Sequence, residues 1–353
     1  MSQAFRSLLQ KVGSGSHTSK DLSRAEAAIA TCMMLEQEAT PAQLGAFMIA
    51  HRIKRPTPEE LAGMLDAYDQ LGPKLTAIES AYPVTVFSVP YDGRSRTLPI
   101  SPLTALMLAA VKAPVVLHGG DRMPTKYGLP LIEIWQGLGV NWQQLSLAQA
   151  QQMLAETGLS FVYLPRHFPQ AQAMVPYRDQ IGKRPPFATI EIMWSPYAGN
   201  THLVSGFVHP PTEERTVASL ALRKRPFFTT VKGLEGSCDL ARSRTAIIGL
   251  GQINGMFDRL LLSPRDYGFS TEDPPLLEEA DAIAALQSVI DGKPSEVAQS
   301  AIWNGGFYLW RCGVSHTLEA GFTLAEKLVL QGQLQQKLAE VQEAIAAQVL
   351  VTS

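Results

Sequence analysis

Cysteine is scarce in this sequence, and neither sign of charge dominates it. The three cysteines, Cys32, Cys238 and Cys312, lie far apart and form neither a CxxC pair nor a Cys/His metal spacing. A secreted domain held by disulfides is therefore not expected. The formal net charge of −2 gives no overall attraction to nucleic acid or to an anionic membrane. Binding to nucleic acid would need a local basic patch.

Long apolar runs are also missing. No stretch reaches the roughly 18 residues that a membrane span needs, and residues 1–11 lack the apolar core of a signal peptide. We therefore expect a cytoplasmic protein that contacts no membrane. Hydrophobic residues still make up 46% of the 353 residues, which is enough for a sizeable core. This length exceeds the size at which one core usually stops growing, so two domains are expected.

Three helix starts can be recognised in the first 75 residues. In the segments 23–26, 40–43 and 57–60, a Ser or Thr precedes a Glu or Gln by three positions. This capping-box pattern is typical of a helix N-terminus, and apolar residues then follow at helical spacing. The pattern predicts a small all-helical domain over residues 1–75.

From residue 82 onward, short β-branched and aromatic runs alternate with helical patterns. The alternation predicts an α/β domain over residues 80–353, with a mainly parallel central sheet flanked by helices. Residues after 317 predict one long helix. The predicted strands are 84–89, 114–117, 160–164, 187–194, 203–209 and 227–231. Ligands of such sheets bind beyond the carboxyl ends of the strands, so the loops after residues 89, 117 and 231 are candidate sites.

The first of these loops carries Asp92, Gly93, Arg94 and Arg96 and leads into a helix that begins near Ser101. Free N–H groups and the helix dipole make such a helix start a suitable place for an anion. The two arginines would add positive charge. A solvated surface turn is the alternative interpretation of this loop.

The second loop, residues 118–128, combines glycines with Arg122 and Lys126. Glycine lets the backbone approach a phosphate closely, and the cations can neutralise it. The loop therefore predicts a phosphate site. A metal site that uses His118 and Asp121 is the alternative.

The third loop, residues 231–239, is rich in glycine and acidic side chains. Glu235 and Asp239 are candidate ligands for Mg²⁺, which usually takes one or two carboxylates together with substrate phosphate. Cys238 is a poor candidate nucleophile because no histidine is near it in sequence. A small structural thiol is the commoner role for such a residue.

Taken in this order behind these helices, the loops resemble the anthranilate phosphoribosyltransferase family nearly end to end. Residues 38–44 and 57–60 are similar to its helical N-terminal domain, residues 118–128 to its KHGNR…SKSG loop, and residues 206–210 to its GVYHP motif. The resemblance implies a nucleoside phosphorylase/phosphoribosyltransferase-type fold. It also implies that about residues 165–183 join the helical domain in space, and that this domain forms a homodimer.

The family's reaction belongs to tryptophan biosynthesis: anthranilate attacks C1 of phosphoribosyl pyrophosphate, and Mg²⁺ binds the pyrophosphate. The protein's tasks in such a reaction are positioning and charge neutralisation. The resemblance implies a phosphoribosyl pyrophosphate side made of Asp92, Gly93, Ser101 and Lys126. It implies an acceptor side made of His118, Gly119 and Arg178.

Four functional segments depart from the family pattern. The GTGGDG loop reads SVPYDG at residues 88–93, NIST reads LPIS at 98–101, KHGN reads LHGG at 117–120, and the metal-binding DE pair reads Cys238-Asp239. These changes remove close-approach glycines, a lysine and a metal-binding aspartate. The pattern resembles the divergent, anthranilate phosphoribosyltransferase-like branch, some members of which bind nucleic acid.

The altered loops are rich in arginine, which can neutralise phosphate without a metal. The arginines expected to converge are Arg94, Arg96, Arg122, Arg242 and Arg244. We therefore expect a degenerate site that holds a phosphate-bearing ligand, such as phosphoribosyl pyrophosphate, and does not depend on Mg²⁺. Nucleic-acid binding, transfer to another acceptor, a purely structural role and the orthodox anthranilate enzyme remain alternatives.

Overall fold

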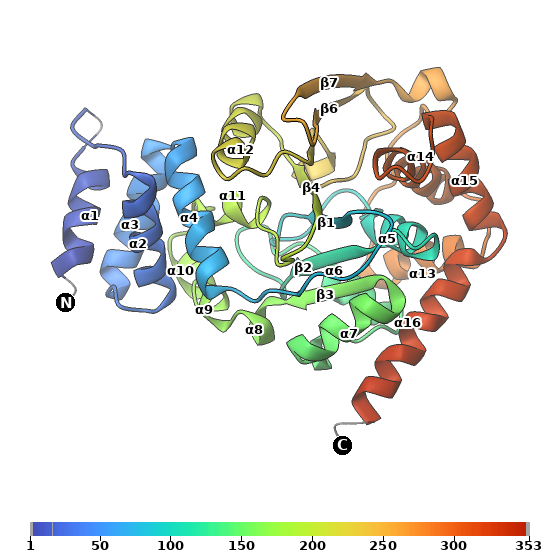
Figure 1. The fold of residues 1–353 in the computed structure, drawn as a ribbon, viewed down its shortest axis with the longest axis horizontal. Coiled ribbons are helices and arrows are strands. Elements are labelled where there is room, and N and C mark those ends of the chain that lie inside the picture. Colours follow the sequence, from blue (N-terminus) through green and yellow to red (C-terminus); the bar gives the residue numbers. More distant parts are fainter. Residues whose placement is uncertain (1–2, 16, 351–353) are drawn as a thin grey trace.

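A bundle of helices lies beside a seven-stranded sheet in this protein (Figure 1). The computed structural model describes residues 3–15 and 17–350. The bundle contains α1 (Gln3–Gly13), α2 (Arg24–Leu35), α3 (Pro41–Lys54) and α4 (Pro58–Leu71). All three predicted capping boxes are present, at the starts of α2, α3 and α4. The prediction of a helical N-terminal domain is confirmed.

The sheet has the strand order β3-β2-β1-β4-β5-β6-β7. The five strands from β3 to β5 are parallel, whereas β6 runs antiparallel to β5 and β7 antiparallel to β6. The prediction of a mainly parallel sheet is therefore confirmed. The strands are β1 (Val84–Ser88), β2 (Val115–Gly119), β3 (Leu159–Tyr163), β4 (Thr201–Gly206), β5 (Phe228–Val231), β6 (Ala246–Gly251) and β7 (Phe257–Leu262).

Both faces of the five parallel strands are buried, as expected for such strands. Successive residues of a strand point to opposite faces, so Phe87 of β1 enters one hydrophobic core and Val86 enters the other. The longer helices around the sheet are α5 (Ser101–Ala110), α6 (Leu131–Gly137), α7 (Leu147–Thr157), α12 (Pro210–Leu222), α13 (Glu279–Ile290), α14 (Glu296–Arg311), α15 (Leu318–Leu330) and α16 (Gln333–Leu350).

Four short helices connect the sheet to the bundle. α10 contacts α3, and Phe168 packs edge-on against Tyr68 of α4 with ring centroids 5.2 Å apart. The core beneath the bundle is thus continuous with this segment. These helices are α8 (Leu164–His167), α9 (Pro169–Gln172), α10 (Val175–Gln180) and α11 (Phe187–Glu191); the 3-10 turns are η1 (Trp142–Gln144), η2 (Leu234–Gly236) and η3 (Pro264–Tyr267).

Two predicted elements are wrong. Residues 187–194 do not form a strand: Pro186 already has helical dihedral angles, φ −55° and ψ −23°, and α11 follows it. The predicted single C-terminal helix is two helices, α15 and α16, because Gly332 between them has a φ of 70° that a continuous helix cannot accommodate. The antiparallel pair β6 and β7 was not predicted, because β7 is mostly exposed and lacks the apolar run of a buried strand.

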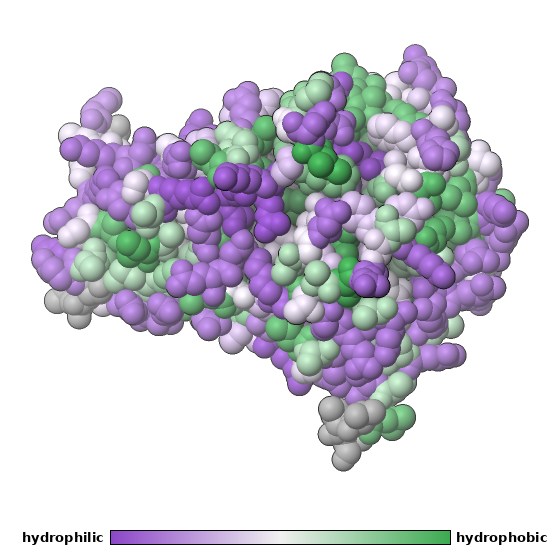
Figure 2. Space-filling model, in the orientation of Figure 1, coloured by the Kyte–Doolittle hydropathy of each residue, from purple (hydrophilic) through white to green (hydrophobic). Residues whose placement is uncertain are grey.

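The surface shown in Figure 2 carries a band of hydrophilic residues where the bundle meets the rest of the molecule. Ion pairs cross this junction: Arg223, directly after α12, pairs with both Asp66 and Asp69 of α4. Within residues 3–15 and 17–350, no helix has the length and apolar character to cross a membrane.

Candidate functional site

Three loops meet at the carboxyl ends of β1, β2 and β5. The loop after β1 pairs with the loop after β2, since Arg94 N–H donates to Leu129 O at 3.1 Å and Leu129 N–H donates back at 2.7 Å. Gly93 makes this approach possible: its φ is 74°, and a Cβ there would lie 2.4 Å from Gly128 O. The local sequence therefore fixes how the first two candidate loops face each other.

Arg94 is buried between the first and third loops. Its Nη1 donates to Asp239 Oδ2 at 2.9 Å and to Ser237 Oγ at 2.7 Å, and its Nε donates to Glu235 Oε1 at 3.3 Å. The guanidinium thus joins the two carboxylates that the sequence suggested as metal ligands. The bonds to the two carboxylates are charge-assisted, which makes them stronger than hydrogen bonds between neutral groups.

The carboxylate of Glu235 sits in a ring of donors that we call the Glu235 cradle. The backbone N–H groups of Ser95, Arg96 and Thr97 donate to it at 3.2, 3.0 and 3.1 Å, and Lys126 Nζ lies at 3.3 Å. Burial alone would raise the pKa of Glu235. The Arg96 N–H and the charges of Lys126 and Arg94 outweigh it and hold the pKa well below its usual range.

Lys126 and Asp92 belong to the same ion-pair network. Asp92 is buried and accepts from Arg184 Nε at 2.7 Å, while Lys126 Nζ lies 4.0 Å from its other oxygen. Burial lowers the pKa of Lys126, and Asp92 and Glu235 oppose that shift. Sequence reasoning missed Arg184 as a site residue. The available signal was the pair of adjacent cations Lys183-Arg184.

His118 is fully buried and fixed by two hydrogen bonds. Ser88 Oγ donates to Trp194 O at 3.3 Å, so its contact with His118 Nε2 at 3.1 Å requires the imidazole to donate there. Nδ1 then accepts from the Tyr91 hydroxyl at 2.5 Å. Burial lowers the pKa of His118 to about 3, so the ring is neutral.

Arg178, predicted on the acceptor side, is paired with a carboxylate inside the protein. Its Nη1 and Nη2 donate to Glu191 at 3.2 and 3.0 Å. Burial raises the pKa of Glu191, while the charge of Arg178 opposes the rise. A planar guanidinium held in this way is positioned rigidly.

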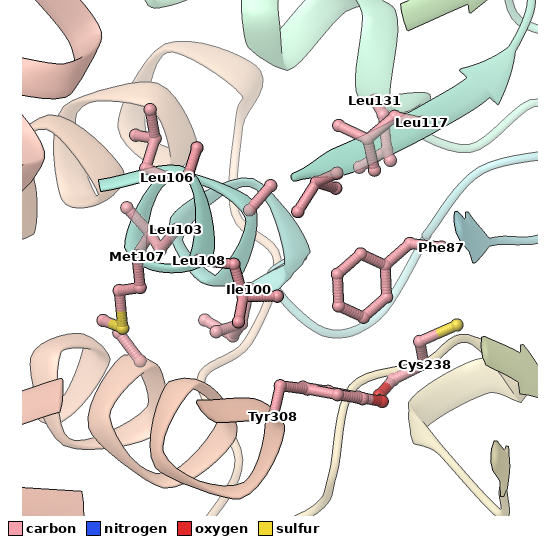
Figure 3. Close-up of a cluster of buried hydrophobic side chains, with 14 of the residues drawn as sticks. Phe87, Ile100, Leu103, Leu106, Met107, Leu108, Leu117, Leu131, Cys238 and Tyr308 are labelled. Atoms are coloured by element: carbon pink, nitrogen blue, oxygen red, sulfur yellow. The ribbon is translucent and has the colours of Figure 1, made fainter. Parts of the chain in front are cut away.

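Cys238 belongs to the hydrophobic core. Its sulfur contacts Ser88 O at 3.3 Å and Val204 O at 3.4 Å, and the Tyr308 hydroxyl donates to its carbonyl at 2.5 Å. Figure 3 shows Cys238 beside Phe87 and Tyr308, among buried apolar side chains. Burial raises the pKa of this thiol well above its usual value. It is therefore neither a nucleophile nor a metal ligand here.

The candidate metal ligands do not fit a Mg²⁺ site. Asp239 Oδ2 accepts from Arg94 and, at 3.0 Å, from Ile100 N–H, and the Glu235 carboxylate is surrounded by donors. A cation there would face the Arg94 guanidinium directly. In the part of the chain that the structure describes, no group of three His, Cys, Asp or Glu side chains is placed to hold a metal ion.

The arginines expected to converge divide into three groups. Arg94 is buried in the site, and Arg96 and Arg244 line a cavity next to it. Arg122 instead pairs with Glu133 and Glu279, and Arg242 donates to Phe269 O and Glu296. Neither Arg122 nor Arg242 lines any of the three cavities around the Arg94 network. Arg122 lies in the second loop and Arg242 follows the third, but their side chains bind partners outside the site.

Three cavities surround the network. The closed cavity, about 20 Å³, has space for about one water molecule, although five predicted residues line it: Gly93, Arg94, Ser101, His118 and Gly119. The interdomain cavity, about 830 Å³, lies between α3 and the loops of the α/β domain. The basic cavity, about 530 Å³, is lined by Arg96, Lys126, Arg184, Lys232 and Arg244. The two larger cavities share Arg184, Val208 and Glu235.

Known proteins match this chain over nearly all of its length. The anthranilate phosphoribosyltransferase of Azorhizobium caulinodans is 28% identical, covering 98% of this chain and 99% of its own. That of Listeria monocytogenes serovar 1/2a is also 28% identical, covering 95% and 96%.

Solved structures share the fold. The anthranilate phosphoribosyltransferase of Thermus thermophilus superposes with a TM-score of 0.77 at 17% identity, covering 97% of this chain and 99% of its own. The Saccharomyces cerevisiae enzyme in complex with phosphoribosyl pyrophosphate and Mg superposes with a TM-score of 0.81 at 13% identity, covering 98% and 99%.

Two family models also match, and they follow the two parts of the structure. Residues 6–72 match the helical bundle domain of a glycosyl transferase family, and residues 92–335 match the a/b domain of a glycosyl transferase family. Together with the relatives above, these matches show that the chain belongs to this glycosyl transferase family, as an anthranilate phosphoribosyltransferase-like member.

Proposed function

We propose that this protein holds a phosphate-bearing ligand in the basic cavity without a metal ion and does not transfer a phosphoribosyl group. The observation that carries the proposal is the Glu235 cradle. Three backbone N–H groups and Lys126 surround one carboxylate of the chain itself. A ring of donors around an anion is the arrangement that recognises phosphate.

Charge in the basic cavity supports the same ligand class. Five cationic side chains line it against two carboxylates, Glu235 and Asp273. Asp273 is already engaged, since it accepts from Arg242 N–H at 2.7 Å and Ser243 Oγ at 2.5 Å. A phosphate carries more charge than a carboxylate and has three acceptor oxygens. It would compete with Glu235 for the same donors.

The positions of Arg94 and Asp239 support binding without transfer. Departure of pyrophosphate needs strong neutralisation of its developing charge, which a metal ion commonly supplies. Here Asp239 is held by Arg94 and Ile100, and Cys238 is buried in the core. Arginine neutralises charge in a fixed direction and remains part of the protein, so the arrangement suits retention of a ligand more than release of a leaving group.

The alternative is an active transferase, which the end-to-end match to anthranilate phosphoribosyltransferases favours. Such an enzyme would act on phosphoribosyl pyrophosphate with anthranilate or another acceptor.

Nucleic acid is a further candidate ligand, since its backbone also carries phosphate. A cytoplasmic location and a homodimer through the helical domain remain part of the proposal. Four large side chains of that domain, Phe47, Met48, Met64 and Tyr68, are buried in the core and do not contribute to its surface.

A transfer assay separates these functions. The protein is incubated with phosphoribosyl pyrophosphate, Mg²⁺ and anthranilate, and consumption of anthranilate is followed beside the A. caulinodans relative as a positive control. We expect no consumption above the protein-free blank. Turnover within a factor of about ten of the relative would establish the enzyme instead. Oligonucleotide binding that weakens steeply with added salt would identify nucleic acid as the ligand.

A further inference from the structure

We infer that the interdomain cavity contains a second anion-binding site, formed by Arg52, Arg55 and Arg215, which we call the rim arginines. Arg52 and Arg55 come from the end of α3, and Arg215 comes from α12. The inference rests on the proposed function in one respect: one ligand would bind both at the Glu235 cradle and at the rim arginines. That ligand is a small molecule with two anionic groups, of the bisphosphate class.

The carboxylates of the interdomain cavity are all engaged elsewhere. Asp92 pairs with Arg184, and Glu191 pairs with Arg178. Glu235 is held in its cradle by loop N–H groups and Lys126. No carboxylate that lines this cavity is therefore free to pair with the rim arginines.

In the described part of the chain, the side chains of the rim arginines are not held in ion pairs. Among the described residues, none of the three forms an ion pair, and Arg52 Nε donates only to a neutral group, the carbonyl of Arg184, at 2.8 Å. Unpaired cations at the wall of a cavity create a positive potential that attracts anions.

Arg55 and Arg215 are close enough to repel each other. Arg215 is half-buried, and its pKa is lowered first by burial and then by the charge of Arg55, while the neighbouring Glu214 opposes the shift. Like charges held together raise the free energy of the empty site, and a bound anion removes that repulsion. The pair therefore favours occupancy by a negatively charged group.

The backbone at Arg55 gives an independent reason. Arg55 has φ 66° and ψ 111° directly after α3, in a region that favours glycine and strains other residues. Its side chain is exposed and makes no hydrogen bond within the described residues. Packing within the protein therefore gives no reason for an arginine at position 55. Binding of an anionic ligand in the cavity would give one.

The volume and connection of the cavities indicate the kind of ligand. About 830 Å³ lies within the range of small-molecule pockets. Because Arg184, Val208 and Glu235 line both larger cavities, a ligand in the interdomain cavity borders the Glu235 cradle. One phosphate would meet Lys126 and Arg184 beside the cradle, and the other would meet the rim arginines. Such a ligand would also join α3 of the helical domain to α12.

Calorimetric titration with fructose 1,6-bisphosphate and fructose 6-phosphate as probes tests the second site. We expect the bisphosphate to bind about tenfold more tightly than the monophosphate. Arg55→Gln and Arg215→Gln should each remove most of that preference and leave monophosphate binding unchanged. Lys126→Gln should weaken both probes. Arg265→Gln, an exposed arginine outside these cavities, is the matched control and should change neither.

The outcomes distinguish the two proposals. Equal bisphosphate affinity for wild type, Arg55→Gln and Arg215→Gln would overturn the second site, while a loss in Lys126→Gln alone would leave the proposed function standing. A loss in the rim variants with no effect of Lys126→Gln would overturn the cradle as the phosphate site. Absence of binding by both probes would overturn both, and binding of a thymidine oligonucleotide alone would overturn the small-molecule ligand.

A glycine variant separates ligand binding from folding. Arg55→Gly relieves the strained backbone, so we expect its thermal unfolding midpoint to equal or exceed that of wild type. Its bisphosphate affinity should nevertheless fall by the same factor as in Arg55→Gln. A lowered midpoint with unchanged affinity would show that Arg55 has a structural role and would contradict the inference.

Discussion

Arg94 donates from all of its side-chain nitrogens to partners within the protein. Glu235, Asp239, Ser237 and Thr97 accept from it, and its side chain is buried. A cation in that position stabilises two carboxylates that would otherwise repel each other. The same contact makes these carboxylates poor ligands for a second cation. One residue therefore links the stability of the loops to the poor fit of these two carboxylates to a metal ion.

Gly93 is the residue on which the pairing of the first two loops depends. Gly93→Ala places a methyl group 2.4 Å from Gly128 O at a φ of 74°. Gly255→Ala is the matched control, because Gly255 has a φ of 84° with nothing within 4 Å of the added Cβ. We expect Gly93→Ala to lower the free energy of unfolding by about 1–3 kcal/mol more than the control, measured by urea denaturation. Equal losses would contradict the proposed close approach.

At the residue scale, sequence reasoning located loops better than side-chain partners. Gly93, Arg94 and Ser101 were predicted on the phosphate side and His118 on the acceptor side, and all four line one cavity. The partners could not be predicted, since Arg94 pairs with Asp239 across 145 positions of sequence. Such contacts depend on the strand order, which no local pattern contains.

Helix α4 shows how a local motif acquires a tertiary role. Glu60 closes the capping box of α4 by accepting from Thr57 N–H at 2.7 Å. It also accepts from Leu22 N–H at 2.9 Å, just before α2, and pairs with Lys54 of α3 at 2.8 Å. One fully buried carboxylate thus connects three helices of the bundle.

Acid should destabilise the bundle through Glu60. Burial opposes ionisation, but His51, Lys54 and Leu22 N–H outweigh it and lower the pKa of Glu60 from 4.5 to about 2. A lowered folded-state pKa gives stability that is present above pH 4.5 and is lost as the pH falls toward 2. The shift corresponds to on the order of 3 kcal/mol.

The comparison uses Glu60→Gln, with denaturant unfolding measured between pH 7 and pH 2.5. We expect the stability advantage of wild type to shrink as the pH falls through this window. Glu79→Gln, which changes an exposed carboxylate, should show no such trend. A constant difference between wild type and Glu60→Gln at every pH would be inconsistent with the proposed role.

At the element scale, helix starts were predictable because a capping box is a local interaction. The boxes at Ser23, Thr40 and Thr57 all form. The segment 187–194 was misassigned because its apolar residues suit a buried strand as well as a helix. Tertiary packing decides between them, and here Trp194 packs against Tyr68 and Phe168 of neighbouring helices.

The whole molecule places one large cavity where the helical and α/β domains meet, and a second beside it among the loops of the α/β domain. Their cations and the buried network around Arg94 are consistent with an anthranilate phosphoribosyltransferase-like scaffold adapted to hold phosphate. The fold class and the family could be predicted from sequence, because many short motifs occur in one order. The cavity volumes could not be predicted from sequence. The cavity lined by five of the predicted site residues measures only about 20 Å³, and the interdomain cavity is lined mainly by residues that were not predicted.

The central claim is that arginine and backbone donors, with no metal ion, hold the ligand. Calorimetric titration with phosphoribosyl pyrophosphate in EDTA, and again in Mg²⁺, measures this directly. We predict saturable binding whose dissociation constant changes less than about threefold between the two conditions. Binding that occurs only with Mg²⁺ would contradict the account, because it would require Glu235 and Asp239 to exchange Arg94 for a metal ion.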